Sequence, residues 1–153
     1  MTATKNIARN LRDTVNEAIS WLNSISDDES ARATAPGKWS RKEIIGHLID
    51  SASNNHQRFV RGQLADHYTS AGYAQNEWVS LQRYRDAEWL SLVALWREYN
   101  LHLARIIEST PDDVAESHRV QLVDSNEAQS LGWWMSDYVG HLKHHLEQIL
   151  TAT

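Results

Sequence analysis

The chain has 153 residues, enough for one domain with a buried core, and we expect a single domain over residues 1–153. It has no cysteine, which excludes disulfides, thiolate nucleophiles and iron–sulfur clusters, so any bound metal must be held by nitrogen and oxygen. The 15 Lys and Arg residues against 20 Asp and Glu give a net charge of −5. Because nucleic-acid binding needs a basic patch, this charge disfavours it.

The N-terminal residues 1–7 lack the apolar core of a secretory signal, and no apolar run of about 18 residues is long enough to span a bilayer. We therefore expect a cytoplasmic protein that binds neither nucleic acid nor membrane.

The spacing of apolar residues predicts an all-α protein, since they recur every three or four positions and the chain has only 6 Gly and 2 Pro. A first helix is predicted over roughly 4–26 and is followed by a loop at 27–37. Its apolar stripe is Ile7, Leu11, Val15, Ala18, Leu22 and Ile25.

A capping box, Ser40 with Glu43, predicts the start of a second helix that runs from Arg41 to about Arg61. The pattern then breaks down over 62–76. A connection of this length extends up to ~50 Å, more than the ~30 Å of a 20-residue helix, so it is long enough to cross a bundle and let the second and third helices run parallel.

The third helix is predicted from an apolar stripe and ends before Pro111. Residues 112–126 form a second long connection with an extended piece at 119–123, and the fourth helix starts near Glu127. The stripe of the third helix is Trp89, Leu92, Val93, Trp96, Tyr99, Leu103 and Ile106.

Three histidines suggest a metal site. His141 and His145 are four residues apart on the fourth helix, so both side chains leave the same face, about 5–6 Å apart at Cβ, and can reach one cation. They share an inward stripe with Tyr138, and His47 faces inward from the second helix. A single buried histidine is more often satisfied by a hydrogen bond, but the combination favours a ligand set. Three protein ligands leave a position open, which is the pattern of catalytic metal sites.

A polar stripe accompanies His47 on the second helix, at Asp50, Ser51, Asn54 and Arg58. We expect Asp50 or Asn54 to orient an imidazole or to accept a hydrogen bond from water at the site, with Arg58 and Tyr138 also near it. The alternative is an ordinary solvated helix face.

The other histidines have no comparable partners. His144 is permitted by spacing to pair with His141, but its direction predicts a position on the flank or surface. Glu43 is already accounted for by the capping box. The histidines expected to be ordinary are His56, His67, His102 and His118.

Several known catalytic motifs are absent. Leu142 follows His141 where a zincin needs Glu, and the paired Glu-x-x-His units of di-iron bundles are missing. There is no nucleophile elbow and no phosphate-binding glycine loop. Any chemistry at the histidines therefore depends on a cation.

Three segments resemble the DinB/YfiT-like superfamily of metal-dependent four-helix proteins: residues 38–51, residues 54–59 and residues 137–149, which carry His47, His141 and His145. Residues 73–78 and 95–100 are also similar to the middle of such proteins. The resemblance implies a four-helix bundle with a long crossover between helices two and three. It further implies that the three histidines bind a divalent metal, nickel or zinc.

The resemblance also sets the functional hypotheses. Members include S-transferases that use low-molecular-weight thiols, a thiol-dependent isomerase and proteins described as hydrolases. We therefore expect a metal-dependent enzyme with a small-molecule substrate, either a thiol S-transferase or a hydrolase. The alternatives are a non-catalytic metal-binding or stress-associated module, and a bundle whose histidines are only hydrogen-bonded. We also expect a homodimer.

Overall fold

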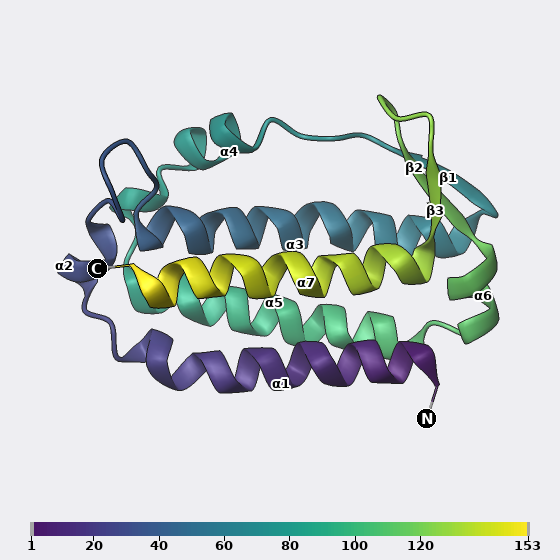
Figure 1. Ribbon diagram of the computed structural model, residues 1–153, viewed down its shortest axis with the longest axis horizontal. Helices are drawn as coiled ribbons and strands as arrows, with labels where there is room; N and C mark the ends of the chain where they lie inside the picture. Colours follow the sequence, from purple (N-terminus) through teal and green to yellow (C-terminus); the bar gives the residue numbers. More distant parts are fainter. Residues whose placement is uncertain (1, 153) are drawn as a thin grey trace.

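The computed structural model describes residues 2–152. Four long helices lie side by side: α1 (Ala3–Asn23), α3 (Arg41–Leu64), α5 (Trp89–Ser109) and α7 (Leu131–Thr151) (Figure 1). Helices α1 and α7 run in one direction, while α3 and α5 run in the other (Figure 1). The expected all-α four-helix bundle is therefore confirmed, and its second and third long helices are parallel.

The connection between α3 and α5 travels along the outside of α3 from one end of the bundle to the other (Figure 1). It contains strand β1 (His67–Ser70), helix α4 (Gln75–Gln82) and the short 3-10 helix η1 (Tyr84–Asp86). The long crossover is thus confirmed. Helix α4 and strand β1 are additions to the sequence prediction.

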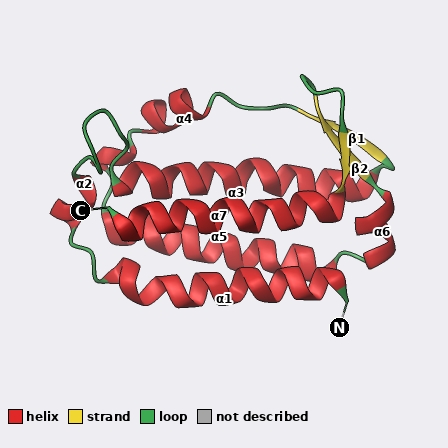
Figure 2. Cartoon of the chain, viewed as in Figure 1, coloured by secondary structure: helices red, strands yellow, loops and turns green. Residues whose placement is uncertain are grey.

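The second connection closes a small sheet at one end of the bundle (Figure 2). After α6 (Asp112–Ser117), strand β2 (Arg119–Leu122) pairs in parallel with β1 and antiparallel with β3 (Ala128–Ser130). The extended piece expected at 119–123 is confirmed. The start of the last helix near Glu127 was wrong, because residues 128–130 pair with β2 and the Ser130 hydroxyl caps α7 by accepting from the Trp133 N–H.

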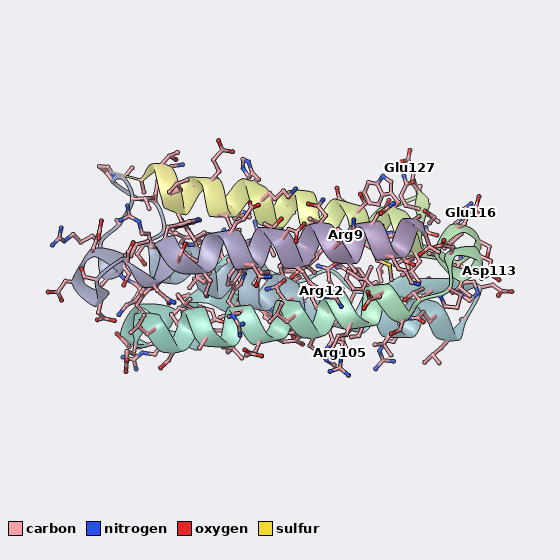
Figure 3. The ribbon with its side chains drawn as sticks, turned by 90° about the horizontal axis from the view of Figure 1, so that it is seen from below. Arg9, Arg12, Arg105, Asp113, Glu116 and Glu127 are labelled. Atoms are coloured by element: carbon pink, nitrogen blue, oxygen red, sulfur yellow. The ribbon has the colours of Figure 1, made fainter. Side chains whose placement is uncertain are left out.

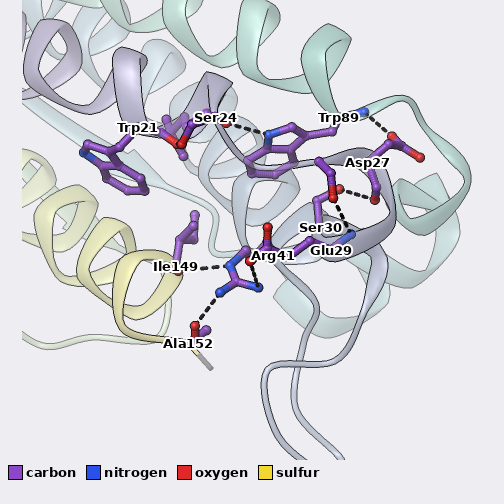
Figure 4. Close-up of polar contacts among 11 residues, drawn as sticks. Trp21, Ser24, Asp27, Glu29, Ser30, Arg41, Trp89, Ile149 and Ala152 are labelled. Atoms are coloured by element: carbon purple, nitrogen blue, oxygen red, sulfur yellow. Dashed lines mark hydrogen bonds and ion pairs between the residues drawn. The ribbon is translucent and has the colours of Figure 1, made fainter.

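The segment expected as a loop at 27–37 begins instead with a short helix, α2 (Asp27–Ala31), which Ser26 caps through the Glu29 N–H. Helix α1 ends at Asn23, somewhat earlier than predicted. The Asp27 carboxylate accepts a hydrogen bond from the Trp89 N–H at 2.9 Å, which fixes α2 against the start of α5 (Figure 4).

Arg41 joins the two helices that carry the histidines. Its guanidinium donates to the carbonyl of Ile149 at 3.1 Å and to that of Ala152 (Figure 4). The capping box of Ser40 and Glu43 is present and begins α3 just before this contact. The first turn of α3 is therefore held against the last turn of α7.

The core is built from the apolar stripes that the sequence predicts, and α1 packs along α5 over much of their length. On the outer surface, Arg12 of α1 forms an ion pair with Glu108 of α5 at 2.7 Å. Figure 3 shows Arg12 and Arg9 on α1, with Asp113 and Glu116 at the sheet end of the bundle. Within residues 2–152, no helix is long and apolar enough to cross a membrane.

Candidate metal centre

Helix geometry brings His47 and His145 to the same level of the bundle. His47 follows the first residue of α3 by six positions, and His145 precedes the last residue of α7 by six. At 1.5 Å per residue each lies ~9 Å from its helix end. Because α3 and α7 are antiparallel and Arg41 ties those ends together, the two side chains meet between the helices.

His141 completes a cluster with these two residues. One ring nitrogen from each of His47, His141 and His145 lies within 4.8 Å of the other two. The Nε2 atoms of His141 and His145 are 3.1 Å apart, and the ring centroid of His47 is 4.7 Å from that of His145. The three residues singled out from the sequence are therefore brought together from α3 and α7.

The surroundings keep these imidazoles neutral. Burial lowers the pKa of His47 to about 4, and the neighbouring His145 and His141 add to the shift. Burial also lowers the pKa of His141 and of His145. Since the neutral ring is the form that binds a metal, the cluster is ready to act as a ligand set at neutral pH.

Two contacts fix the orientation of the rings. The side-chain oxygen of Gln148 accepts a hydrogen bond from Nδ1 of His145 at 2.8 Å. This contact leaves Nε2 of His145 pointing toward His141. The indole of Trp39 packs on His47 with ring centroids 5.1 Å apart. Sequence reasoning missed Gln148, although its position three residues after His145 on the same helix is a detectable signal.

The donor set fits a divalent ion. His47 is only 1% exposed, and its Nδ1 has no hydrogen-bond partner within residues 2–152. A buried imidazole nitrogen without a hydrogen bond destabilises the folded state unless the ring binds another group, such as a metal ion. The cluster contains nitrogen ligands only, which suits zinc, nickel, copper or iron better than magnesium or calcium.

Asp50 lies on α3 one turn beyond His47, but it hydrogen-bonds no imidazole. Its Oδ1 accepts from the Tyr84 hydroxyl at 2.6 Å and from the Gln82 amide at 2.8 Å. Burial raises the pKa of Asp50. Asp50 therefore attaches the crossover segment to α3, and the expected contact with an imidazole is not seen within residues 2–152. Its Oδ2 has no hydrogen-bond partner there, so the expected hydrogen bond from water at the site stays a prediction.

The other polar residues named from the sequence are also engaged elsewhere. Asn54 donates to the backbone carbonyl of Asp50, and the Tyr138 hydroxyl donates to Asn100 of α5. Arg58 donates to Ser70 in strand β1. None of these contacts reaches a histidine of the cluster, although Tyr138 and Arg58 line a cavity that touches His141.

The remaining histidines lie outside the cluster. His144 is exposed on α7, as its direction predicted. His56 bonds through Nδ1 to the Tyr99 hydroxyl at 2.9 Å, and His118 bonds through Nδ1 to the Gly62 carbonyl at 2.7 Å. The hydrogen-bonded interpretation therefore holds for these last two.

Two cavities adjoin the histidine cluster. The larger, of about 500 Å³, touches His145 and is lined by Thr34, Gly37, Lys38, Trp39, Ile44, Asn76, Gln148, Thr151 and Ala152. The smaller, of about 150 Å³, touches His141 and is lined by Ser51, Asn55, Arg58, Tyr73, Trp134, Asp137 and Tyr138. The cluster thus has room for ligand atoms on two sides.

Comparison with known proteins agrees with this architecture. The structure of YfiT from Bacillus subtilis, described as a probable metal-dependent hydrolase with an unusual four-helix bundle topology, matches with a TM-score of 0.85 and 19% sequence identity, over 96% of this chain and 83% of YfiT. At this identity the match establishes a shared fold. A search of curated proteins gives no match. The model of the DinB superfamily matches residues 10–149, so the chain belongs to the DinB superfamily.

Proposed function

We propose that His47, His141 and His145 bind one divalent metal ion, nickel or zinc, and that the protein is a metal-dependent enzyme acting on a small molecule. The observation that carries this proposal is the convergence of three neutral imidazoles with ligand nitrogens within 4.8 Å, of which His47 is buried and His141 and His145 are partly exposed. Three protein ligands leave a position for a substrate group. The description of YfiT as a probable metal-dependent hydrolase supports the same class of activity.

The chain's own residues hold the ligands in place. Gln148 keeps Nε2 of His145 directed into the cluster, while Trp39 covers His47. A divalent ion bound here supplies Lewis acidity, which lowers the pKa of a thiol or water that reaches it.

Of the two candidate activities, we propose thiol transfer first and keep hydrolysis as the alternative. The cavity of about 500 Å³ beside His145 is within the size range of small-molecule sites, so it has room for a nucleophile larger than water. Lys38 lines it and would attract an anionic molecule. Hydrolysis is kept as the second candidate because of the description of YfiT.

Spectroscopy of the cobalt-substituted protein tests thiol binding. Low-molecular-weight thiols are titrated into the wild type, into His47→Gln and into the control His56→Gln, whose histidine lies on the same helix outside the cluster. We expect a thiolate-to-cobalt absorption band in the wild type and the control, and none in His47→Gln. If no thiol changes the spectrum of the wild type, thiol transfer is contradicted.

Turnover assays then separate the two reactions. Thiol transfer predicts consumption of an electrophile such as a chlorodinitrobenzene only when thiol is present, whereas hydrolysis predicts release of a chromophore from a nitrophenyl ester without thiol. Both require His141 and are abolished by chelation. Absence of both activities, together with a melting temperature that chelation does not change, would instead favour a non-catalytic module.

The oligomeric state remains part of the proposal. A homodimer predicts a sedimentation coefficient for twice the 17.5 kDa chain mass. A single species at the monomer mass across micromolar concentrations would contradict it.

A further inference from the structure

Arg58 is a buried cation that forms no ion pair with a carboxylate of residues 2–152, although Asp137 lines the same cavity. The Arg58 side chain is 7% exposed. The guanidinium carbon lies 5.1 Å from the ring centre of Trp134, so the planar group stacks on the indole. Buried charges are normally paired, so an unpaired guanidinium in a cavity wall points to a ligand of opposite charge.

The guanidinium is held in place by hydrogen bonds, but not all of its N–H donors are used. Nε donates to the Ser70 hydroxyl at 3.0 Å, Nη1 to the Asn55 side chain at 3.4 Å and Nη2 to the Ala71 carbonyl at 3.3 Å. A guanidinium has five N–H donors, so two remain. All three acceptors are neutral, so none of these hydrogen bonds balances the positive charge.

The cavity of about 150 Å³ connects this group to the histidine cluster, since Arg58 and His141 line the same space. Trp134, which stacks on Arg58, and His141 are seven residues apart on α7, which is ~10 Å along the helix. In an engineered protein a cavity of about this volume holds benzene, so roughly six non-hydrogen atoms fit. The space suits a short acid that extends from Arg58 toward His141.

The cavity wall favours a singly charged anion. Tyr73 offers a hydroxyl that burial keeps protonated by raising its pKa. Asp137 also lines the cavity, one turn before His141, and is exposed. Its negative charge repels a dianion such as phosphate more strongly than it repels a singly charged carboxylate ligand.

We propose that Arg58 binds the carboxylate of a small organic monoacid, whose reacting group lies at the histidine cluster. This inference rests on the proposed function, because it names the substrate class for the same site. The planar fork of Arg58 matches a carboxylate in bidentate geometry. The stacking of Trp134 and the bond to Ser70 then keep the guanidinium directed at the ligand.

Chain-length series of thiols test the inference on cobalt-loaded protein. The ω-mercapto acids from mercaptoacetate to 6-mercaptohexanoate are compared with the ω-mercapto alcohols of the same length, using the thiolate-to-cobalt band to measure dissociation constants. In the wild type we expect at least one length at which the acid binds ten-fold more tightly than the alcohol. Equal binding at every length would overturn the proposal.

Three variants separate recognition from structure. Arg58→Gln should lose the preference for the acid while its affinity for the alcohol changes less than two-fold, and Arg58→Lys should retain part of the preference. Ser70→Ala removes the strand contact but keeps the charge, so it should retain most of the preference. If Arg58→Gln still prefers the acid, or if Ser70→Ala loses as much as Arg58→Gln, Arg58 is not the anion-binding group.

A metal-free titration keeps the inference testable if thiols do not bind. Nuclear magnetic resonance follows the Arg58 Nε–H and the Trp134 indole N–H while butyrate, butyramide or inorganic phosphate is added. Saturable shifts with butyrate alone support the carboxylate site. Larger shifts with phosphate, or equal shifts with butyramide, overturn it. A failed thiol titration beside a positive butyrate titration would reject thiol transfer and keep the acid site.

Discussion

Helices α1 and α3 both face the core of the bundle, but they bury different side chains. The buried face of α1 is apolar except for Thr4 near its start. Helix α3 buries a comparable apolar flank, and along its other flank it also buries His47, Asp50, Asn55 and Arg58. Burying polar and charged groups costs free energy unless they are paired, so α1 stabilises the bundle while α3 gives up stability to build a site.

Unpaired buried atoms mark the same difference. Within residues 2–152, three buried side-chain atoms have no hydrogen-bond partner, and two of them, His47 Nδ1 and Asp50 Oδ2, are on α3. None is on α1. Changes in α1 should therefore affect folding alone, whereas changes in the polar flank of α3 should affect binding.

The largest loss of stability is expected for Leu11→Ala in α1. Leu11 is fully buried, so truncation removes apolar contacts and leaves a cavity that costs about 2–5 kcal/mol. Urea unfolding measures the change, with Leu81→Ala as control because Leu81 is 81% exposed. The number of metal ions bound per folded chain should not change. A decrease in the free energy of unfolding below ~1 kcal/mol would contradict the conclusion that α1 mainly stabilises the bundle.

The metal-free protein should lose stability as the pH falls from about 6.5 to about 4. In this window the unfolded chain protonates His47 and the folded chain does not, because burial holds the folded pKa at about 4. The unfolded state therefore binds more protons, and the free energy of unfolding falls with pH by up to roughly 3 kcal/mol.

Urea unfolding of chelated protein at pH 7.5 and pH 4.5 measures this effect. In His47→Gln the decrease should be smaller by that amount, whereas His67→Gln, at an exposed position, should behave as the wild type. Parallel pH dependences for the wild type and His47→Gln would show that His47 is not buried in its neutral form.

A smaller loss is expected for Gly46→Ala, beside His47. An added Cβ would lie 2.1 Å from Cδ2 of the Tyr84 ring, so the ring that bonds Asp50 must move, at a cost of about 1–3 kcal/mol. Gly140→Ala is the matched control on α7, where nothing lies within 4 Å, and it should gain up to ~1 kcal/mol. Equal effects of the two substitutions would mean that Tyr84 does not pack on α3.

The long helices and the pairing of His141 with His145 could be predicted because they depend on local periodicity, whereas His47 is added to the pair from its inward position on the second helix and from the family resemblance. A stripe such as Leu11 and Val15, or the spacing of His141 and His145, fixes which side chains share a face before any tertiary contact is known. The capping box at Ser40 likewise marks the start of α3.

The rest depends on contacts between distant segments. Helix α4 has one buried residue, Val79, so its pattern is too weak to be read as a helix. Residues 128–130 become a strand only because β2 lies beside them. The partners of Asp50 and Arg58 come from the crossover, where Tyr84 and Ser70 follow them by 34 and 12 residues. No local pattern relates such positions.

Anomalous diffraction from crystals of nickel- or zinc-loaded protein, recorded at the absorption edge of the metal, tests the central claim most directly. We expect one strong peak between α3 and α7, at about 2.0–2.1 Å from one ring nitrogen each of His47, His141 and His145. The peak should be absent in His141→Gln and present in the control His56→Gln. A peak elsewhere, or one that persists in His141→Gln, would contradict the three-histidine centre.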